Sequence, residues 1–417
     1  MAGVPVALVG AGQRGHFVYG AYALEHPDEI TFVAIADRDP ERRRRFGEAH
    51  GIPEMRRYPT AGELIASESE PVAAVVATPD RAHAADAIPL LDAGYGVLLE
   101  KPIAATASDT LAVADSARGR LLQIALVLRY TPFFRALNQA IAGGQIGEVM
   151  ATTHRENVAA WHMAHSFVRG NWGRRTEGSP MIVQKCCHDL DIMAWNLPSK
   201  VVTVSSYGSL RHFRPERTPS GATERCTDPC PVDDCPYDAR TIYLDQRRSG
   251  WPIHVISDDL SPEGRLHALA SGRFGECVYT AGSDVVDNQI VAMELQDGTT
   301  AGLVMHGHSA EESRTMRYDG TRGTLRARFG RDTAIEITEH GESPRPIPHA
   351  AAAGGHGGGD SGVIRAFLRA VDRGSAADVE VGETLTGHML GFAAEESRLT
   401  GQPIDMARFV EAANGTG

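Results

Sequence analysis

The sequence lacks several features that would point to a membrane protein, a secreted protein or a nucleic-acid-binding protein. No apolar run reaches the roughly 18–20 residues that a bilayer-spanning helix needs. The 41 Lys and Arg residues are outnumbered by 53 Asp and Glu residues, and the formal net charge of -12 argues against nucleic acid and anionic membrane surfaces as partners. The chain begins with a strand-like stretch instead of a basic, apolar leader, so we expect a cytoplasmic protein.

Cysteine is also scarce, with six residues in a chain of 417. In a reducing compartment we expect these residues to be free thiols, metal ligands or buried small side chains, and not a disulfide framework. The composition is that of a folded protein, with 42% hydrophobic and 23% charged residues. A chain of this length is expected to form two or three domains.

The N-terminal third alternates short apolar runs with helical stretches such as 39–51. The runs that read as buried strands are 4–10, 30–37, 72–78, 96–100 and 121–128. Strands that alternate with helices indicate a parallel, doubly wound α/β sheet. We therefore predict a Rossmann dinucleotide-binding domain over 1–129 and a second α+β domain over 130–417.

A glycine-rich loop joins the first predicted strand to the first helix. Its residues are Gly10, Ala11, Gly12, Gln13, Arg14 and Gly15. In such a G-x-G-x-x-G loop the first glycine permits a tight turn, the second lets a pyrophosphate approach the backbone, and the third allows the helix to pack closely on the strand. The N–H groups at the start of the helix can then bind the anion.

The second strand ends at Asp37, which is followed by Arg38. A carboxylate at this position can bind both ribose hydroxyls and repel a 2′-phosphate, which favours NAD. An arginine can pair with that phosphate, so NADP is the alternative cofactor. We predict NAD.

Two further loops and a C-terminal stretch form, together with the glycine loop, a combination of motifs that is more specific than any one of them. The motifs are Thr78-Pro79 with His83, the triplet Glu100-Lys101-Pro102, and HGGGDSGVIRAFLRAV at 356–371. Together with the glycine loop, this set resembles the Gfo/Idh/MocA family of NAD(P)-dependent oxidoreductases over nearly the whole chain. The resemblance implies that Lys101 lies beside the nicotinamide ring, hydrogen-bonds the reacting hydroxyl and helps to move its proton.

The stretch QKCCHDLD at 184–191 lies in a predicted helix over 184–196. Lys185 and His188 are three residues apart and therefore neighbours on the helix surface, whereas Cys186 and Cys187 project elsewhere and are interpreted as packing residues. The resemblance implies an aspartate and a histidine four residues apart here. His188 matches the histidine, but Gln184 replaces the aspartate.

This replacement leaves three candidate proton-handling groups. We expect Lys101, Lys185 and His188 to form a cluster in which the cations lower one another's proton affinity. His188 is the predicted general base, because imidazole already titrates near neutral pH. Asp189 or Asp191 is expected to orient its ring or to cap a neighbour.

The second domain is predicted to be a mostly antiparallel sheet. Its expected strands are 148–157 and 201–210, followed by two hairpins at 288–309 and 315–329. The resemblance implies an open sheet face that mediates homodimers or homotetramers. The tail helices, predicted at 360–373 and 383–399, are expected to pack back onto the body, and the Ala/Gly/His-rich segment 351–359 is expected to enter the active site.

An insertion at about 211–275 carries Cys226, Cys230 and Cys235, and Cys277 follows it. Three or four thiols in a polar loop are compatible with a structural zinc ion, which can hold together a loop that has no core. The C-x3-C-x4-C spacing differs from that of common zinc ribbons, so free thiols on a packed insertion are an equal alternative.

Several aromatic and basic residues fall in segments that we expect near the nicotinamide. The candidate substrate-binding residues are Arg129, His154, Arg155, Trp161, His162, His165, Trp172, Gln184 and Asp189. Aromatic faces stack on sugar C–H surfaces, and arginine or histidine suits an anionic group. The set indicates a polar carbohydrate, either neutral or acidic.

Three functions are compatible with this pattern. The favoured one is an NAD-dependent dehydrogenase of a sugar, inositol or sugar derivative. The second is an NAD-dependent glycosidase that oxidises C3 transiently and needs an extra base for the C2 proton, for which Tyr130 or Lys185 is the candidate. A non-catalytic NAD sensor is disfavoured, because Lys101 and His188 are expected to lie together.

Overall fold

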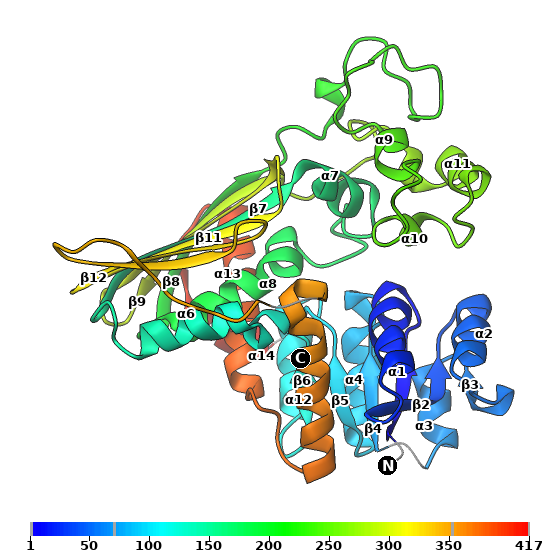
Figure 1. The fold of residues 1–417 in the computed structure, drawn as a ribbon, viewed down its shortest axis with the longest axis horizontal. Coiled ribbons are helices and arrows are strands. Elements are labelled where there is room, and N and C mark those ends of the chain that lie inside the picture. The colour runs from blue at the N-terminus through cyan, green and yellow to red at the C-terminus, as the bar shows by residue number, and fades with distance from the viewer. Residues whose placement is uncertain (1–2, 70–71, 352–353, 416–417) are drawn as a thin grey trace.

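The computed structural model describes residues 3–69, 72–351 and 354–415. Two sheets organise the molecule, one in the N-terminal third and one in the remainder of the chain (Figure 1). Residues 352–353, which belong to the predicted active-site loop, lie outside the described part. Within the described residues, no helix is both long and apolar enough to cross a membrane.

The first sheet has six parallel strands in the order β3-β2-β1-β4-β5-β6. The strands are β1 Val4–Val9, β2 Ile30–Ala36, β3 Arg57–Tyr58, β4 Ala73–Val76, β5 Gly96–Leu99 and β6 Leu122–Ile124. The order reverses between β1 and β4, and ligands bind at such a switch point, outside the carboxyl ends of the strands. The predicted Rossmann sheet is therefore confirmed.

Helices cover both faces of this sheet. They are η1 Gly15–Gly20 with α1 Ala21–Glu25, α2 Pro40–Ala49, α3 Ala61–Ser67, α4 His83–Asp92 and α5 Ala107–Ser116. Side chains fix where they begin: Thr60 and Thr106 each accept a hydrogen bond from the backbone N–H three residues on. The sequence therefore places each helix start directly after a strand or a turn.

A helix from the other end of the chain completes this domain. In α12, Gly359–Arg373, the side chains of Val363, Ile364 and Phe367 belong to the same buried cluster as Leu8 and Phe32 of the first sheet. Figure 1 shows α12 standing beside β5 and β6. The core of the N-terminal domain thus includes residues from far beyond position 129.

The second sheet has nine strands in the order β14-β13-β12-β11-β7-β10-β9-β8-β15. The strands are β7 Val149–Ala159, β8 Val201–Ser209, β9 Asn288–Leu295, β10 Thr300–Ser309, β11 Ser313–Gly320, β12 Gly323–Phe329, β13 Ala334–Glu339, β14 Arg345–Pro346 and β15 Ile404–Asp405. The β7–β10 pair is parallel and the other pairs are antiparallel, so a mostly antiparallel sheet is confirmed.

One face of the second sheet is buried and the other is open. Burial alternates along β9, as it does in a strand with only one covered face. The covering helices are α6 Pro132–Ala142, α8 Met181–Asn196, α13 Val381–Thr400 and α14 Met406–Asn414 (Figure 1). The predicted helix at 184–196 is α8, which begins three residues earlier, directly after Pro180.

The insertion forms a small helical unit beyond the end of the second sheet (Figure 1). Its helices are α9 Ala239–Tyr243, α10 Ile253–Ile256 and α11 Pro262–Ser271, and it packs beside α7 Ala160–His162 and η5 Met163–Arg169. Its own core is small and consists of Ala239, Ile242, Tyr243, Ile253 and Leu269.

Candidate active site

The three glycines of the predicted phosphate loop have different surroundings. Gly10 has φ +94°, and a Cβ there would come within 2.8 Å of the backbone of Ala77 and Thr78. A Cβ on Gly15 would lie 2.0 Å from the carbonyl oxygen of Gly10, whereas a Cβ on Gly12 would meet nothing within 4 Å. Gly10 and Gly15 are therefore required by packing, and Gly12 faces open space of the kind that a pyrophosphate needs.

Asp37 is fixed at the end of β2. Its carboxylate accepts hydrogen bonds from the backbone N–H of Ala11 (2.7 Å) and of Asp39 (2.8 Å). A carboxylate has about four acceptor positions, so two remain for ribose hydroxyls. Arg38 is exposed. The loop and Asp37 together fit a dinucleotide.

Arg14 and Glu100 brace the start of η1 against the loop after β5. Arg14 Nε donates to Glu100 Oε1 (2.5 Å), and Arg14 also donates to Asp360 at the start of α12 (2.8 Å). Burial alone would raise the pKa of Glu100, but the Arg14 guanidinium outweighs burial and lowers it. The Asp360 carboxylate is also 3.0 Å from His356 Nδ1, so this network reaches the predicted active-site loop.

His83 ties together the two loops that carry the family-like motifs. One ring nitrogen lies 2.9 Å from the carbonyl oxygen of Thr78, and the other lies 2.7 Å from that of Pro102. The Lys101–Pro102 peptide is cis. His83, predicted to contact the cofactor, thus holds the ends of β4 and β5 together through backbone contacts.

Lys101 lies against the first turn of α8. Its Nζ donates to the backbone carbonyl of Gln184 (3.1 Å) and lies 5.9 Å from the ring centre of Trp172. Burial lowers the pKa of Lys101, and the positive charges of Lys185 and Arg14 lower it further. The lysine is thereby positioned on the same helix that carries the candidate base.

His188 is buried one turn along α8 from Gln184. Burial, followed by the charge of Lys101, lowers the pKa of His188 well below its usual value, so the ring is neutral at pH 7. His188 Nδ1 and Gln184 Oε1 are both buried, and neither has a hydrogen-bond partner among the described residues. Because residues four apart share one face of a helix, these two atoms are available to the same ligand.

The loop predicted at 351–359 reaches the same helix face. The ring of His356 lies 6.4 Å from that of His188.

Family models match almost the entire chain. The N-terminal model of the Gfo/Idh/MocA family, described as an oxidoreductase family with an NAD-binding Rossmann fold, matches residues 4–126. The model of its C-terminal alpha/beta domain matches residues 138–406. The chain belongs to the Gfo/Idh/MocA family.

Several members of the Gfo/Idh/MocA family are similar to the chain. A putative oxidoreductase YteT of Bacillus subtilis is 27% identical over 80% of each chain. Inositol 2-dehydrogenase 1 of Saccharopolyspora erythraea is 30% identical over 54% of this chain and 62% of its own length. D-glucoside 3-dehydrogenase of Escherichia coli is 30% identical over 36% of this chain and 42% of its own length.

Solved structures share the fold. Levoglucosan dehydrogenase in complex with NADH and L-sorbose has a TM-score of 0.72 at 16% identity, covering 97% of this chain and 99% of that one. An oxidoreductase from Agrobacterium radiobacter in complex with NAD+, L-tartaric acid and magnesium has a TM-score of 0.67 at 18% identity, with the same coverage.

Within this family framework, the two aspartates of α8 have partners other than His188. Asp189 Oδ1 accepts hydrogen bonds from His154 Nε2 and Arg314 Nε, both at 2.8 Å. Asp191 forms a two-point ion pair with Arg129, again at 2.8 Å. The expectation that either aspartate orients His188 is therefore wrong, because the second sheet and η4 Val127–Tyr130 supply cations that bind both carboxylates.

Lys185 also departs from its expected role. Its Nζ lies 3.1 Å from Glu156 and donates to Glu312 at 2.6 Å. Burial alone would lower the pKa of Lys185, but the two carboxylates outweigh burial and raise it. Neighbouring cations lower the pKa of Lys101 and of His188 as expected, but Lys185 departs from the prediction because it is a paired cation and a poor base. Burial raises the pKa of Glu156 to about 7.

Tyr130 lies in the core between the first sheet and α12. It is 7% exposed, and a Cβ on Gly362 of α12 would lie only 2.8 Å from the Tyr130 Cβ. Burial raises the pKa of Tyr130 to about 12. A hydroxyl that holds its proton this tightly is unsuited to the role of base.

The predicted substrate-binding residues separate into three groups. Arg129 is buried in its ion pair with Asp191, and His154 is buried in its hydrogen bond with Asp189. Arg155 lies on the open face of the second sheet, in a groove of about 400 Å³ that Arg317, Arg326 and Arg328 also line. Trp172, Gln184 and His162 remain near Lys101 and α8.

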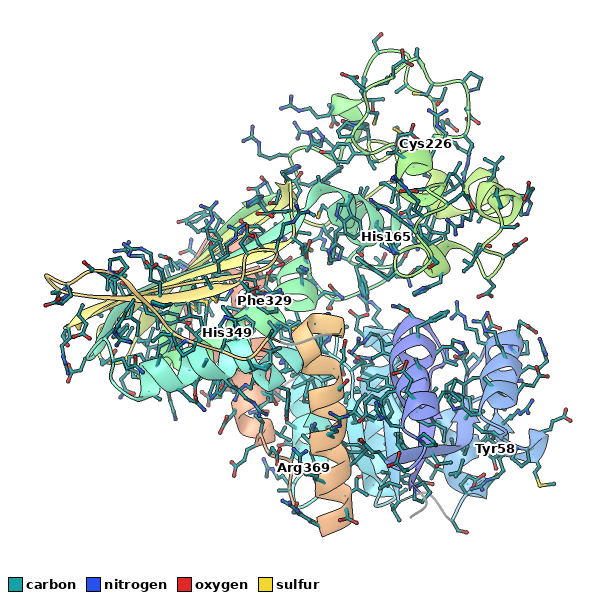
Figure 2. All side chains as sticks on the ribbon, in the orientation of Figure 1. Tyr58, His165, Cys226, Phe329, His349 and Arg369 are labelled. Carbon is teal, nitrogen blue, oxygen red and sulfur yellow. The ribbon has the colours of Figure 1, made fainter. Side chains whose placement is uncertain are left out.

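His165 is buried near the insertion (Figure 2). It hydrogen-bonds to the Tyr243 hydroxyl (2.7 Å), and burial lowers its pKa to about 3. His165 therefore supports the insertion as a neutral ring.

The four cysteines of the insertion region line one cavity, and each is a free thiol. Cys226 lies in the part of the insertion that points away from the N-terminal domain (Figure 2). Across the described ranges, no group of three or more His, Cys, Asp or Glu side chains is arranged to hold a metal ion. The zinc prediction for Cys226, Cys230, Cys235 and Cys277 is therefore not supported.

Three residues that matter to the site were not predicted from the sequence: Glu156, Glu312 and Arg314. Glu156 lies in the strand predicted at 148–157, and an acidic residue at an inward-facing strand position is the signal that could have found it. Glu312 and Arg314 flank the start of β11 and gave no comparable signal.

Proposed function

We propose that this protein oxidises a ring hydroxyl of a neutral sugar or sugar derivative with NAD as the acceptor. The observation that carries the proposal is the placement of Lys101 Nζ on the first turn of α8, next to a neutral His188 whose Nδ1 has no partner among the described residues. A cation and a neutral base on one surface are what the removal of a hydroxyl proton requires.

The residues have distinct roles in this mechanism. The phosphate loop and Asp37 hold the dinucleotide, which supplies a hydride acceptor when bound. Lys101 donates a hydrogen bond to the reacting oxygen and stabilises the negative charge that develops on it. His188 accepts the hydroxyl proton on its free nitrogen. Gln184 Oε1 accepts a hydrogen bond from a second hydroxyl and so orients the ring.

The choice of a neutral substrate follows from the pairing of the cations. Arg129 pairs with Asp191 and Glu383, and Lys185 pairs with Glu156 and Glu312. A substrate carboxylate that binds Arg129 or Lys185 would have to displace one of these buried pairs, at a cost of several kcal/mol. The acidic substrate considered from the sequence is therefore less favoured than a neutral one.

The redox-neutral glycosidase is the weaker alternative. That chemistry needs a base for the C2 proton in addition to the groups at the oxidised carbon. Tyr130 is in the core with its pKa raised to about 12, and the carboxylates around Lys185 keep it protonated. Neither candidate is suited to this extra step.

A panel of monosaccharides, inositols, methyl glycosides and 4-nitrophenyl glycosides tests the proposal. Absorbance of NADH and release of nitrophenol should be followed in the same reaction. We expect NADH to accumulate in proportion to substrate consumed, without nitrophenol. Nitrophenol release without net NADH would establish the glycosidase instead, and an inert panel despite NAD binding would overturn both.

We also propose that the open face of the second sheet joins copies of the chain into a homodimer or homotetramer. This face is exposed, and its groove is lined by both arginine and glutamate side chains, such as Arg326 and Glu336. Sedimentation velocity should give a mass of two or four chains, and a monomer at micromolar concentration would contradict the proposal.

A further inference from the structure

An aromatic group lies where the insertion meets α7. The ring of Trp251 is 5.1 Å from that of Trp161, and the rings of His162 and His165 stand nearly perpendicular to it at 4.9 Å and 5.4 Å. Such edge-to-face packing fixes the orientation of an indole. Trp251 nevertheless remains 39% exposed.

The contacts of Trp251 with neighbouring rings leave part of the indole uncovered. The small buried core of the insertion consists of five other side chains, with Trp161 packed against it, and Trp251 is exposed at the edge of this aromatic group. A large indole held rigidly and left partly open is typical of a ligand contact, because its apolar surface gains free energy only when something covers it.

The segment that carries Trp251 is held over the phosphate loop. His254 Nε2 lies 2.9 Å from Gln13 Oε1, and the His254 ring stacks on Phe17 of η1 with 3.9 Å between ring centres. Asp258 forms an ion pair with Arg45 of α2. These contacts join the insertion to the N-terminal domain at the loop that fits the dinucleotide, so the aromatic group lies at the junction of the two domains.

Side-chain contacts connect the same aromatic group to α8. His162, whose ring stacks with that of Trp161, lies 3.0 Å from Glu312 Oε1, and Lys185 Nζ donates to this same oxygen. Lys185 is three residues before His188 on α8. The indoles are therefore separated from the reacting centre by one short chain of side chains.

We propose that Trp251, with Trp161 beside it, is a stacking subsite for a second ring joined to the oxidised sugar through a glycosidic oxygen. This inference rests on the proposed function and narrows its substrate class to neutral glycosides, such as disaccharides. An indole face stacks on the C–H surface of a pyranose. A nucleotide would need free cations here, whereas Arg45 and Lys185 are already paired.

The test compares three substrates that share one oxidised sugar: the methyl glycoside, a disaccharide and the 4-nitrophenyl glycoside. With saturating NAD, the wild-type protein should have a kcat/KM for the disaccharide roughly tenfold above that for the methyl glycoside. This ratio corresponds to the free energy that stacking of one ring on an indole contributes. Trp251→Ala should bring this ratio close to one, and Trp251→Phe should keep part of it. A response of the nitrophenyl glycoside alone would show an aryl site and overturn the disaccharide.

Leu266→Ala is the matched control, because it removes another exposed apolar side chain from the same insertion. Its substrate ratio should equal that of the wild type. Thermal melts with and without NAD identify any variant that fails to fold, and Trp251→Phe then carries the test. If the methyl glycoside is oxidised and the ratio stays unchanged in both Trp251 variants, the subsite is refuted while the proposed function stands. If none of the three substrates is oxidised, the proposed function itself fails.

Discussion

The function of the phosphate loop and that of the α8 site depend on different structural features. In the loop, function depends on what glycines leave out: Gly10 and Gly15 have no room for a side chain, and Gly12 has room that a ligand can use. At α8, function depends on which partners each charged side chain finds. Within the described residues neither Lys101 nor His188 forms an ion pair with a carboxylate, whereas Lys185, Asp189 and Asp191 do. A contiguous motif therefore specifies the loop, while distant segments decide the charge states around α8.

The largest effect should come from removing the groups without such partners. Lys101→Ala and His188→Ala should each lower kcat by about 10²–10⁴-fold, because each removes a positioned acid–base group. NADH fluorescence titration should still show binding, since the phosphate loop is intact. The double variant should lose much less than the product of the single losses if the two residues act as a unit.

Cys186→Ala is the control for this experiment, because it changes a buried residue of the same helix that has no proposed chemical role. Its turnover should stay near that of the wild type even if its melting temperature falls. Near-normal turnover in His188→Ala would remove the imidazole from the mechanism.

Removing a paired group should instead change stability. Lys185→Met removes the cation between the buried Glu156 and the half-buried Glu312, although Arg314 remains 2.9 Å from Glu156, and this should lower the free energy of unfolding by about 1–3 kcal/mol. Chemical denaturation measures this loss, and Lys200→Met, at an exposed lysine, should change it little. A fully stable but inactive Lys185→Met protein would place Lys185 with the catalytic residues and undo the contrast.

Substitutions of two glycines in the phosphate loop should have similar or smaller effects, and they separate packing from cofactor binding. Gly15→Ala forces a Cβ against the carbonyl of Gly10 and should cost about 1–3 kcal/mol of stability, as overpacking does. Gly12→Ala should leave the melting temperature of the cofactor-free protein unchanged and weaken NAD binding. Calorimetric melts and NAD titrations on both variants separate the two roles, and equal melting losses would contradict the assignment.

The most gradual effect is that of pH on stability. Burial lowers the pKa of His165 to about 3, that of His388 to about 4, and that of His188 well below its usual value. The unfolded chain takes up protons at these residues near pH 6.5 and the folded chain does not. Stability is therefore complete above pH 6.5 and falls as the pH drops toward 4, by up to about 1.4 kcal/mol per pH unit for each histidine. Denaturation midpoints at pH 7.5, 6 and 5 measure the slope, which His388→Gln should reduce; a flat profile would mean that the rings are charged in the folded protein.

The sequence was sufficient for features that depend on neighbours in the chain. The strand, turn and helix around Gly10–Gly15 were predictable because each follows from local residue types, and so was the hairpin at Asp297-Gly298, where Gly298 has φ +87°. The partners of Asp189 were not predictable, because Arg314 is 125 positions away on β11. Tyr130 was misassigned for the same reason: α12, which covers it, comes more than 200 residues later in the chain.

The place of α12 also has a consequence for how the protein is made. The strands of the first sheet have all been translated by residue 124, but the helix that covers one of its faces begins at residue 359. At about 5–20 residues per second, the ribosome needs roughly tens of seconds to bridge that interval. During this time Leu8, Phe32 and their neighbours lack their contacts with α12, so a fragment truncated before α12 should expose apolar surface and aggregate.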